Sequence, residues 1–245
     1  MGSLGLTIDA VGDELHGRGE VLPTMWSPGT EAIRTSILVT WADVILGLLA
    51  VRVVAPRVPI TLDIDVHLFQ PITGIEPVRA IGRVTKLGSS TQVFSIDFID
   101  DSHRHLGFGH ATFMPSPNPE LSIPTGDWAL KPFSSRRTGL TQPLTDVLEC
   151  VRTAPGRVVL PNGPHAKNAA NTLNGGLLAV AIEEAALSAV EGPSALTSMQ
   201  LRYLRPVRAD AVATASVHDG LGHVEVRDSV SDALAIVATT RSVSC

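Results

Sequence analysis

Asp43 lies inside the apolar run 36–54, SILVTWADVILGLLAVRVV, which the sequence predicts to be a helix. No Lys, Arg or His stands three or four positions away on the same helix face to pair with it. An ionised carboxylate buried without partners is costly, so Asp43 must be neutralised, hydrogen-bonded or placed at a solvated cleft. We therefore expect a site residue; the alternative is a narrow solvated stripe on the helix.

A second apolar helix is predicted over 175–190, GGLLAVAIEEAALSAV, and its start is unusual. Asn174 is a typical N-cap residue, and Gly175 and Gly176 would let a ligand approach the backbone closely. The free N–H groups of these glycines, together with the helix dipole, would form an anion or oxyanion site. Two glycines before a helix are also common in ordinary turns.

Glu183 occupies the position in this helix that Asp43 occupies in the first, at an offset of 140 residues. A structural role stays open for Glu183, because adjacent glutamates commonly mark the solvated face of a helix. Its neighbour Glu184 has no equivalent in the first half, and we expect it to face solvent.

The two helices belong to an internal repeat, since each is followed by four strand-like segments in the same order. The first of these segments ends in Pro in both halves, Pro71 matching Pro206 at an offset of 135. The eight segments are 59–72, 78–88, 91–100 and 105–115 in the first half, and 194–207, 211–220, 223–230 and 233–243 in the second.

The repeat predicts two domains, 1–115 and 144–245, separated by a linker over 116–143 that is rich in Pro, Ser, Thr and Gly. Each helix is apolar nearly all round and must be buried on most sides. A single sheet can achieve this only by curling around the helix, which is the geometry of the hot-dog fold. We therefore predict an α+β protein of two tandem hot-dog domains, each a long central helix wrapped by an antiparallel β-sheet.

Composition narrows the function classes. The 245 residues are 44% hydrophobic, which excludes intrinsic disorder, and a net charge of −5 excludes a dominant attraction to nucleic acid or anionic membrane. Two cysteines without metal-site spacing indicate a reducing compartment and no structural metal. His103 and His105 form a short His-x-His, which is more typical of a solvated turn than of a metal site.

Other expectations come from missing patterns. No phosphate-binding loop, dinucleotide fingerprint or serine-hydrolase elbow is present, so no cofactor is expected. The first residues lack the basic and apolar regions of a signal peptide, and Asp43 and Arg52 interrupt the longest apolar run. We expect a cytoplasmic protein that does not cross a membrane.

On these residues the sequence resembles tandem hot-dog thioesterases of the phenylacetate-degradation type. The hallmark of that family is Asn, five residues, His-Gly-Gly, and a catalytic Asp or Glu nine residues after the His. Asn168, the run from Asn174 to Gly176, and Glu183 keep that spacing, with Asn174 in place of the His. In the first half Arg34 takes the His position, Thr35 and Ser36 replace the glycines, and Asp43 keeps the carboxylate.

The resemblance implies a composite site between the halves, in which one helix start faces the carboxylate of the other helix. Its residues would be Asn168, Asn174, Gly175 and Gly176 facing Asp43, assisted by the Thr61 hydroxyl. The reciprocal site would hold Glu183, with Arg34 and Thr197 as substrate contacts, and it lacks both glycines. Arg205, with Arg202 and Arg208, could contact a coenzyme A phosphate, although strand-edge solvation explains these arginines equally well.

The resemblance implies hydrolysis of an acyl-CoA thioester to the free acid and coenzyme A. A carboxylate that activates water or attacks the carbonyl, with donors for the oxyanion, suits this reaction. Two alternatives stay open: a non-catalytic acyl-CoA or lipid-binding protein, and a hot-dog hydratase, which would need an Asp/His dyad. A homodimer of double hot-dog chains is also expected.

Overall fold

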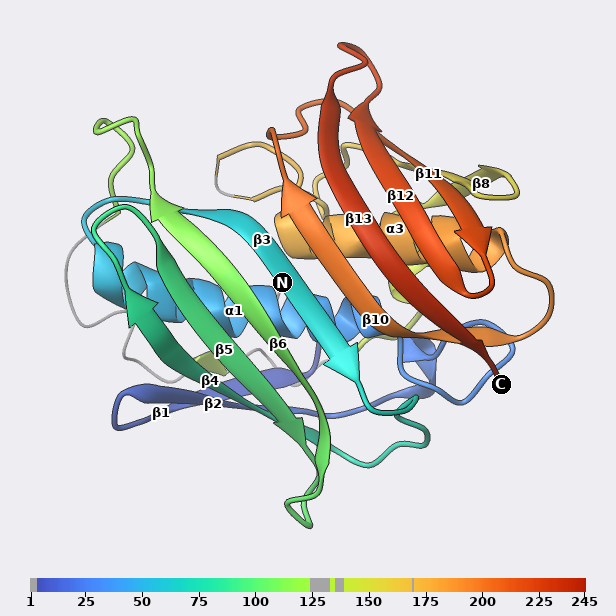
Figure 1. The fold of residues 1–245 in the computed structure, drawn as a ribbon, viewed down its shortest axis with the longest axis horizontal. Coiled ribbons are helices and arrows are strands. Elements are labelled where there is room, and N and C mark those ends of the chain that lie inside the picture. Colours follow the sequence, from blue (N-terminus) through green and yellow to red (C-terminus); the bar gives the residue numbers. More distant parts are fainter. Residues whose placement is uncertain (1–3, 124–132, 135–138, 169) are drawn as a thin grey trace.

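The structure is a computed structural model that describes residues 4–123, 133–134, 139–168 and 170–245 (Figure 1). The first half is built on the helix α1, Thr35–Val54, which ends just before Pro56 because a residue preceding proline disfavours the helical conformation. A 3₁₀ turn, η1, covers Pro23–Met25. The strands are β1 Leu6–Val11, β2 Glu14–Gly19, β3 Pro59–Leu68, β4 Val78–Leu87, β5 Gln92–Ile99 and β6 His105–Pro115.

The second half repeats this order around the helix α3, Gly175–Ser188. A short helix α2, Leu144–Val147, precedes it. The strands are β8 Val151–Ala154, β9 Arg157–Leu160, β10 Ser194–Tyr203, β11 Ala211–His218, β12 Leu221–Asp228 and β13 Leu234–Ser244. Within the predicted linker, the two-residue strand β7, Phe133–Ser134, pairs with β1.

All of these strands form one antiparallel sheet in the order β7-β1-β2-β4-β5-β6-β3-β10-β13-β12-β11-β9-β8. The two halves meet where β3 pairs with β10, with Val66 opposite Met199. The first half of the sheet curls so that β2 through β6 all contact α1, and β9 through β13 surround α3 in the same way (Figure 1). The predicted tandem hot-dog fold is confirmed.

Both predicted helices and all eight predicted strands are present. The hairpins β1–β2 and β8–β9, which extend the sheet at its two outer ends, were not predicted. Their strands are only four to six residues long, and β2 carries Gly17 and Gly19 where a buried apolar residue would normally reveal a strand. The domain boundaries themselves stay a prediction.

The helix α1 is long and apolar enough to cross a membrane by composition alone. Its residues from Thr35 to Ala42 are all buried, and Ile45, Leu46 and Leu49 in its second half are also part of the buried core. Packing inside the sheet therefore accounts for its hydropathy.

The strands β2 and β4 approach α1 so closely that glycine is required at the contact. A Cβ at Gly19 would lie 2.2 Å from the Trp41 ring, and one at Gly17 or Gly82 would lie 2.6 Å from Ile45. These glycines let the sheet close around a large buried Trp41, whose ring nitrogen donates to the Leu4 carbonyl at 3.1 Å.

We predict that Gly19→Ala lowers the free energy of unfolding by about 1–3 kcal/mol, because the added methyl overpacks Trp41. Gly47→Ala is the matched control: a Cβ at Gly47 meets no described atom within 4 Å, so removing a helix glycine should stabilise by about 0.5–1 kcal/mol. Urea unfolding measures both variants. Equal stability of the two would contradict this account of the sheet closure.

Candidate active site

The starts of the two helices and their two carboxylates form a reciprocal pair at the junction of the halves. α1 and α3 pack directly against each other. The Gly176 N–H, at the start of α3, donates to Asp43 of α1. In return, the Thr35 and Ser36 N–H groups at the start of α1 donate to Glu183 of α3, at 2.9 and 3.3 Å. Each helix therefore supplies an anion to the positive end of the other.

Asp43 retains some solvent exposure although protein surrounds most of it. Desolvation raises the pKa of its carboxyl to about 6, and hydrogen bonds from the Gly176 N–H and the Thr61 hydroxyl act in the opposite direction. Thr61 projects from β3 next to a bulge between Thr61 and Asp63, which turns its side chain toward α1. The structure thus brings together three residues that were predicted to share a site: Asp43, Gly176 and Thr61.

Two residues that the sequence analysis missed also belong to this junction. The Tyr203 hydroxyl, from the end of β10, donates to the Gly175 carbonyl at 3.0 Å. Burial and the neighbouring Asp43 raise the pKa of Tyr203 well above its ordinary value. The Thr40 hydroxyl, fully buried one turn before Asp43, lies 2.8 Å from the Ser36 carbonyl of its own helix and 2.9 Å from the Gly176 carbonyl, so these two carbonyls share its single donor. Tyr203 is the only tyrosine in the chain, which is the one signal that could have singled it out.

Asn174 caps α3 as predicted, because its side-chain oxygen accepts from the Leu177 N–H at 3.1 Å. No hydrogen bond among the described residues joins Asn168 to Asp43. The side-chain oxygen of Asn168 accepts from the Ala170 and Thr172 N–H groups, and its amide nitrogen donates to the Thr172 hydroxyl at 2.8 Å. Asn168 therefore shapes the loop that leads into α3.

The two glycines have different surroundings. A Cβ at Gly176 would lie 3.2 Å from the Asp43 carboxylate, so a larger residue here would push Asp43 away by a few tenths of an ångström. Because the Gly176 N–H already donates to Asp43, it is not the free oxyanion donor that the sequence suggested. Gly175 lies against the Tyr203 ring, with a Cβ position 3.3 Å from it.

The reciprocal position is closed. Glu183 has no exposed surface, and besides the two backbone donors it accepts from the Ser36 hydroxyl at 2.5 Å. Burial raises the pKa of Glu183, while Arg34 and the Ser36 hydrogen bonds act against that rise. Thr197 is not brought to this cluster: its hydroxyl donates to the Arg241 carbonyl at 3.5 Å, and the neighbouring Leu196 carbonyl accepts from the Thr35 hydroxyl.

The expectation that Glu184 faces solvent is wrong. Glu184 is buried, and its carboxylate lies 2.6 Å from the Arg34 guanidinium and 2.9 Å from that of Arg152. Arg34 is itself buried and also reaches Glu183, with 3.8 Å between nitrogen and oxygen. Arg34 therefore fills the reciprocal position as part of an ion-pair cluster, where the sequence analysis placed a substrate contact.

Within the described ranges, no three His, Cys, Asp or Glu side chains are grouped to hold a metal ion. His103 and His105 flank the turn between β5 and β6, where His103 has a positive φ of 63°. Arg205 is exposed at the rim of a pocket beyond Tyr203.

A family model matches part of the first half of the chain. Residues 36–106, which contain Asp43 and Thr61, match the family model described as the thioesterase superfamily. A comparison with curated proteins finds no match.

Solved structures of thioesterases share the fold of nearly the whole chain. A 12:0-ACP thioesterase from Umbellularia californica has a TM-score of 0.69 at 10% identity, with 96% of this chain and 98% of that chain covered. An acyl-ACP thioesterase from Bacteroides thetaiotaomicron has a TM-score of 0.66 at 10% identity, covering 94% and 98%. A tesB protein from Mycobacterium avium subs paratuberculosis has 0.60 at 16%, covering 96% and 94%. The predicted resemblance to hot-dog thioesterases is confirmed.

We predict that Arg34→Met lowers the free energy of unfolding by about 3–5 kcal/mol, because it leaves two buried carboxylates without their shared cation. A double variant, Arg34→Met with Glu184→Met, should recover part of that loss, since one of the carboxylates is then gone. Denaturant unfolding of both variants is the measurement. A single variant as stable as the parent would contradict a buried ion cluster at this position.

Proposed function

We propose that this protein hydrolyses acyl-CoA thioesters at one composite site per chain, formed by Asp43 from the first half and the start of α3 from the second. The observation that carries the proposal is Asp43 itself: a partly exposed carboxylate with a pKa of about 6, held by Thr61 and against a glycine helix start. Thioester hydrolysis at neutral pH requires a base of this kind beside backbone donors.

The chemistry follows from these positions. At pH 7 Asp43 is mostly ionised, so it can take a proton from a water molecule as that water attacks the thioester carbonyl carbon. The Gly175 N–H and the side-chain amide of Asn174 would donate hydrogen bonds to the developing oxyanion. The nitrogen of that amide has no hydrogen-bond partner among the described residues. Collapse of the intermediate breaks the C–S bond and gives the carboxylic acid. The departing sulfur takes the proton that Asp43 had accepted, so coenzyme A leaves as the thiol and Asp43 is ionised again.

The reciprocal position is proposed to be inactive. Glu183 accepts hydrogen bonds from two backbone N–H groups and a hydroxyl, and Arg34 and Glu184 occupy the space around it. Without an exposed carboxylate or a glycine pair, a water molecule and a thioester have no place there. This supports one active site per double hot-dog chain.

Coenzyme A as the acyl carrier is supported by the charge next to the site. Tyr203 ends β10 at the reaction centre, and Arg205 follows two residues later with its side chain exposed. A guanidinium at that distance suits a carrier that bears phosphate groups.

We predict that Asp43→Asn reduces kcat/KM for acyl-CoA at least about 100-fold, because the amide cannot accept a proton from water. The variant should be as stable as the parent or more stable above pH 6, since it removes the desolvation of a buried charge. A panel of acyl-CoA substrates with thiol detection measures the rate, and thermal unfolding measures the stability. If the parent protein binds acyl-CoA without turnover, the protein is a non-catalytic binding module instead.

The pH dependence gives an independent prediction. The ionised form of Asp43 is required and its pKa is about 6, so kcat/KM should be half-maximal near pH 6 and level off above about pH 7. Thr61→Val removes a hydrogen bond that lowers the pKa of Asp43, so it should move the rise to higher pH. A pH–rate profile that is flat between pH 5 and 8, or one unmoved by Thr61→Val, would count against Asp43 as the base.

A further inference from the structure

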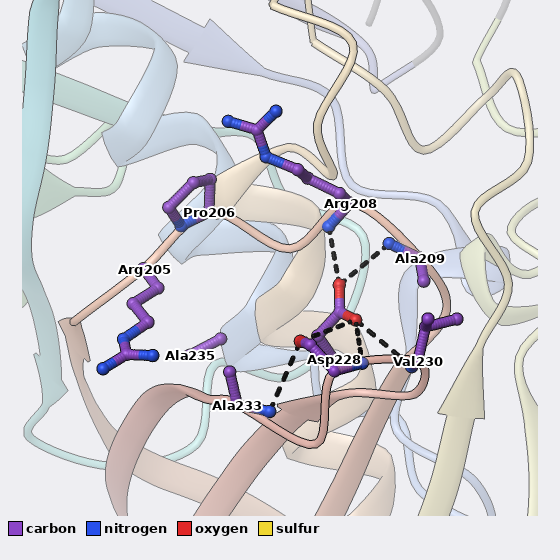
Figure 2. Close-up of a pocket in the computed structure, with 9 residues that line it drawn as sticks. Arg205, Pro206, Arg208, Ala209, Asp228, Val230, Ala233 and Ala235 are labelled. Carbon is purple, nitrogen blue, oxygen red and sulfur yellow. Dashed lines mark hydrogen bonds between the residues drawn. The ribbon is translucent and has the colours of Figure 1, made fainter.

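A second feature of the C-terminal half takes no part in the bond-breaking steps above: a pocket of about 580 Å³ beyond the end of β10, with Arg205 in its lining. It lies between the segment 204–210, which follows β10, and the turn between β12 and β13 (Figure 2). A volume of this size suits a ligand as large as a nucleotide.

The pocket is held in shape by one carboxylate. Asp228 accepts from the Arg208 and Ala209 N–H groups on one side, both at 2.9 Å. On the other side it accepts from the Val230 and Ser231 N–H groups, at 3.2 and 3.0 Å, and from the Ser231 hydroxyl (Figure 2). These donors hold the pKa of Asp228 well below its ordinary value. The hydrogen-bonding capacity of the Asp228 carboxylate is thus used within the walls of the pocket, which fixes the two wall segments relative to each other.

The rim of the pocket is basic. Arg205 and Arg208 are both exposed, and Figure 2 shows their guanidinium groups extending away from Asp228. Neither guanidinium forms an ion pair with any described residue, in a chain whose net charge is −5. Arg205 and Arg208 stand on either side of Pro206 and Val207, and their guanidinium groups extend in different directions (Figure 2), so each offers its donors to a separate phosphate group.

The remaining wall is apolar and partly open to solvent. It consists of Pro206, Ala209, Val230, Ala233 and Ala235, and Val230 is 85% exposed. These small apolar side chains lie beside Arg205 and Arg208, so they offer a surface on which a heterocyclic base can pack while the arginines bind its phosphates.

The pocket is joined to the reaction centre through the backbone. Arg205 lies two residues after Tyr203, at most about 7 Å of extended chain, and the Tyr203 hydroxyl bonds to Gly175. The Val207 carbonyl accepts from the Leu173 N–H at 3.0 Å, immediately before the Asn174 cap. A ligand held here would therefore have a fixed position relative to the start of α3.

We propose that this pocket binds the phosphate-bearing adenosine nucleotide of the thiol carrier, with Arg205 and Arg208 on its phosphates and the base against the apolar wall. The assignment rests on the proposed function for its link to catalysis. A phosphopantetheine arm on a carrier protein also presents a phosphate, so the experiment must separate these two sources.

The test uses adenosine 3′,5′-bisphosphate as the probe in titration calorimetry. The parent protein should bind it, and an Arg205→Gln/Arg208→Gln double variant should weaken the Kd about tenfold or more, the loss expected for charge-assisted hydrogen bonds. Arg241→Gln is the matched control, because Arg241 is exposed on β13 and does not line the pocket. The double variant should raise KM for acyl-CoA while its rate on an acyl-N-acetylcysteamine thioester, which lacks phosphate, stays unchanged.

Failure of binding in the parent, or equal affinity in the double variant, overturns the assignment. A double variant impaired only on carrier-protein thioesters, and not on acyl-CoA, also overturns it and assigns the phosphate to the phosphopantetheine arm. Bisphosphate binding that depends on both arginines, in a protein that hydrolyses neither acyl-CoA nor the cysteamine thioester, would support the pocket and reject the proposed hydrolase.

Discussion

The structure depends on one interaction made twice: a carboxylate in the middle of one central helix accepts hydrogen bonds from the first N–H groups of the other. A helix start carries unpaired donors and partial positive charge, and a buried carboxylate needs both. Asp43 of α1 accepts from the start of α3, and Glu183 of α3 accepts from the start of α1. Each half therefore relies on the other for the hydrogen bonds of its buried carboxylate and of its helix start. The two halves are thus electrostatically dependent on each other, beyond their shared sheet.

The same interaction has diverged in the two halves. Where the helix start is Gly-Gly, the carboxylate keeps contact with solvent and keeps an elevated pKa near neutrality. Where the helix start is Arg34-Thr35-Ser36, the side chains close over Glu183 and add a hydroxyl and a guanidinium to its partners. A difference of three side chains separates a partly exposed carboxylate from a fully buried one.

The fold was predictable because periodicity and order survive duplication: both helices, eight strands and the repeat were readable from local patterns. The position of Asp43 opposite Gly176 was reachable only through the family resemblance, since the contact joins residues 133 positions apart in sequence. Glu184 was mispredicted because a pair of adjacent glutamates looks the same whether water or Arg34 and Arg152 neutralises the second one. Tyr203 was missed because its role arises from the hydrogen bond that joins the end of β10 to the start of α3, a contact between residues 28 positions apart that no local pattern encodes.

The pairing of β3 with β10 determines how the junction responds to dilution. A site assembled from two separate subunits is lost on dilution, since its concentration follows the association equilibrium of the subunits. Here the strand pair lies within one polypeptide, so bringing Asp43 to the start of α3 is a unimolecular event. The junction therefore persists at any protein concentration, and the fraction of molecules that contain it depends only on the folding equilibrium.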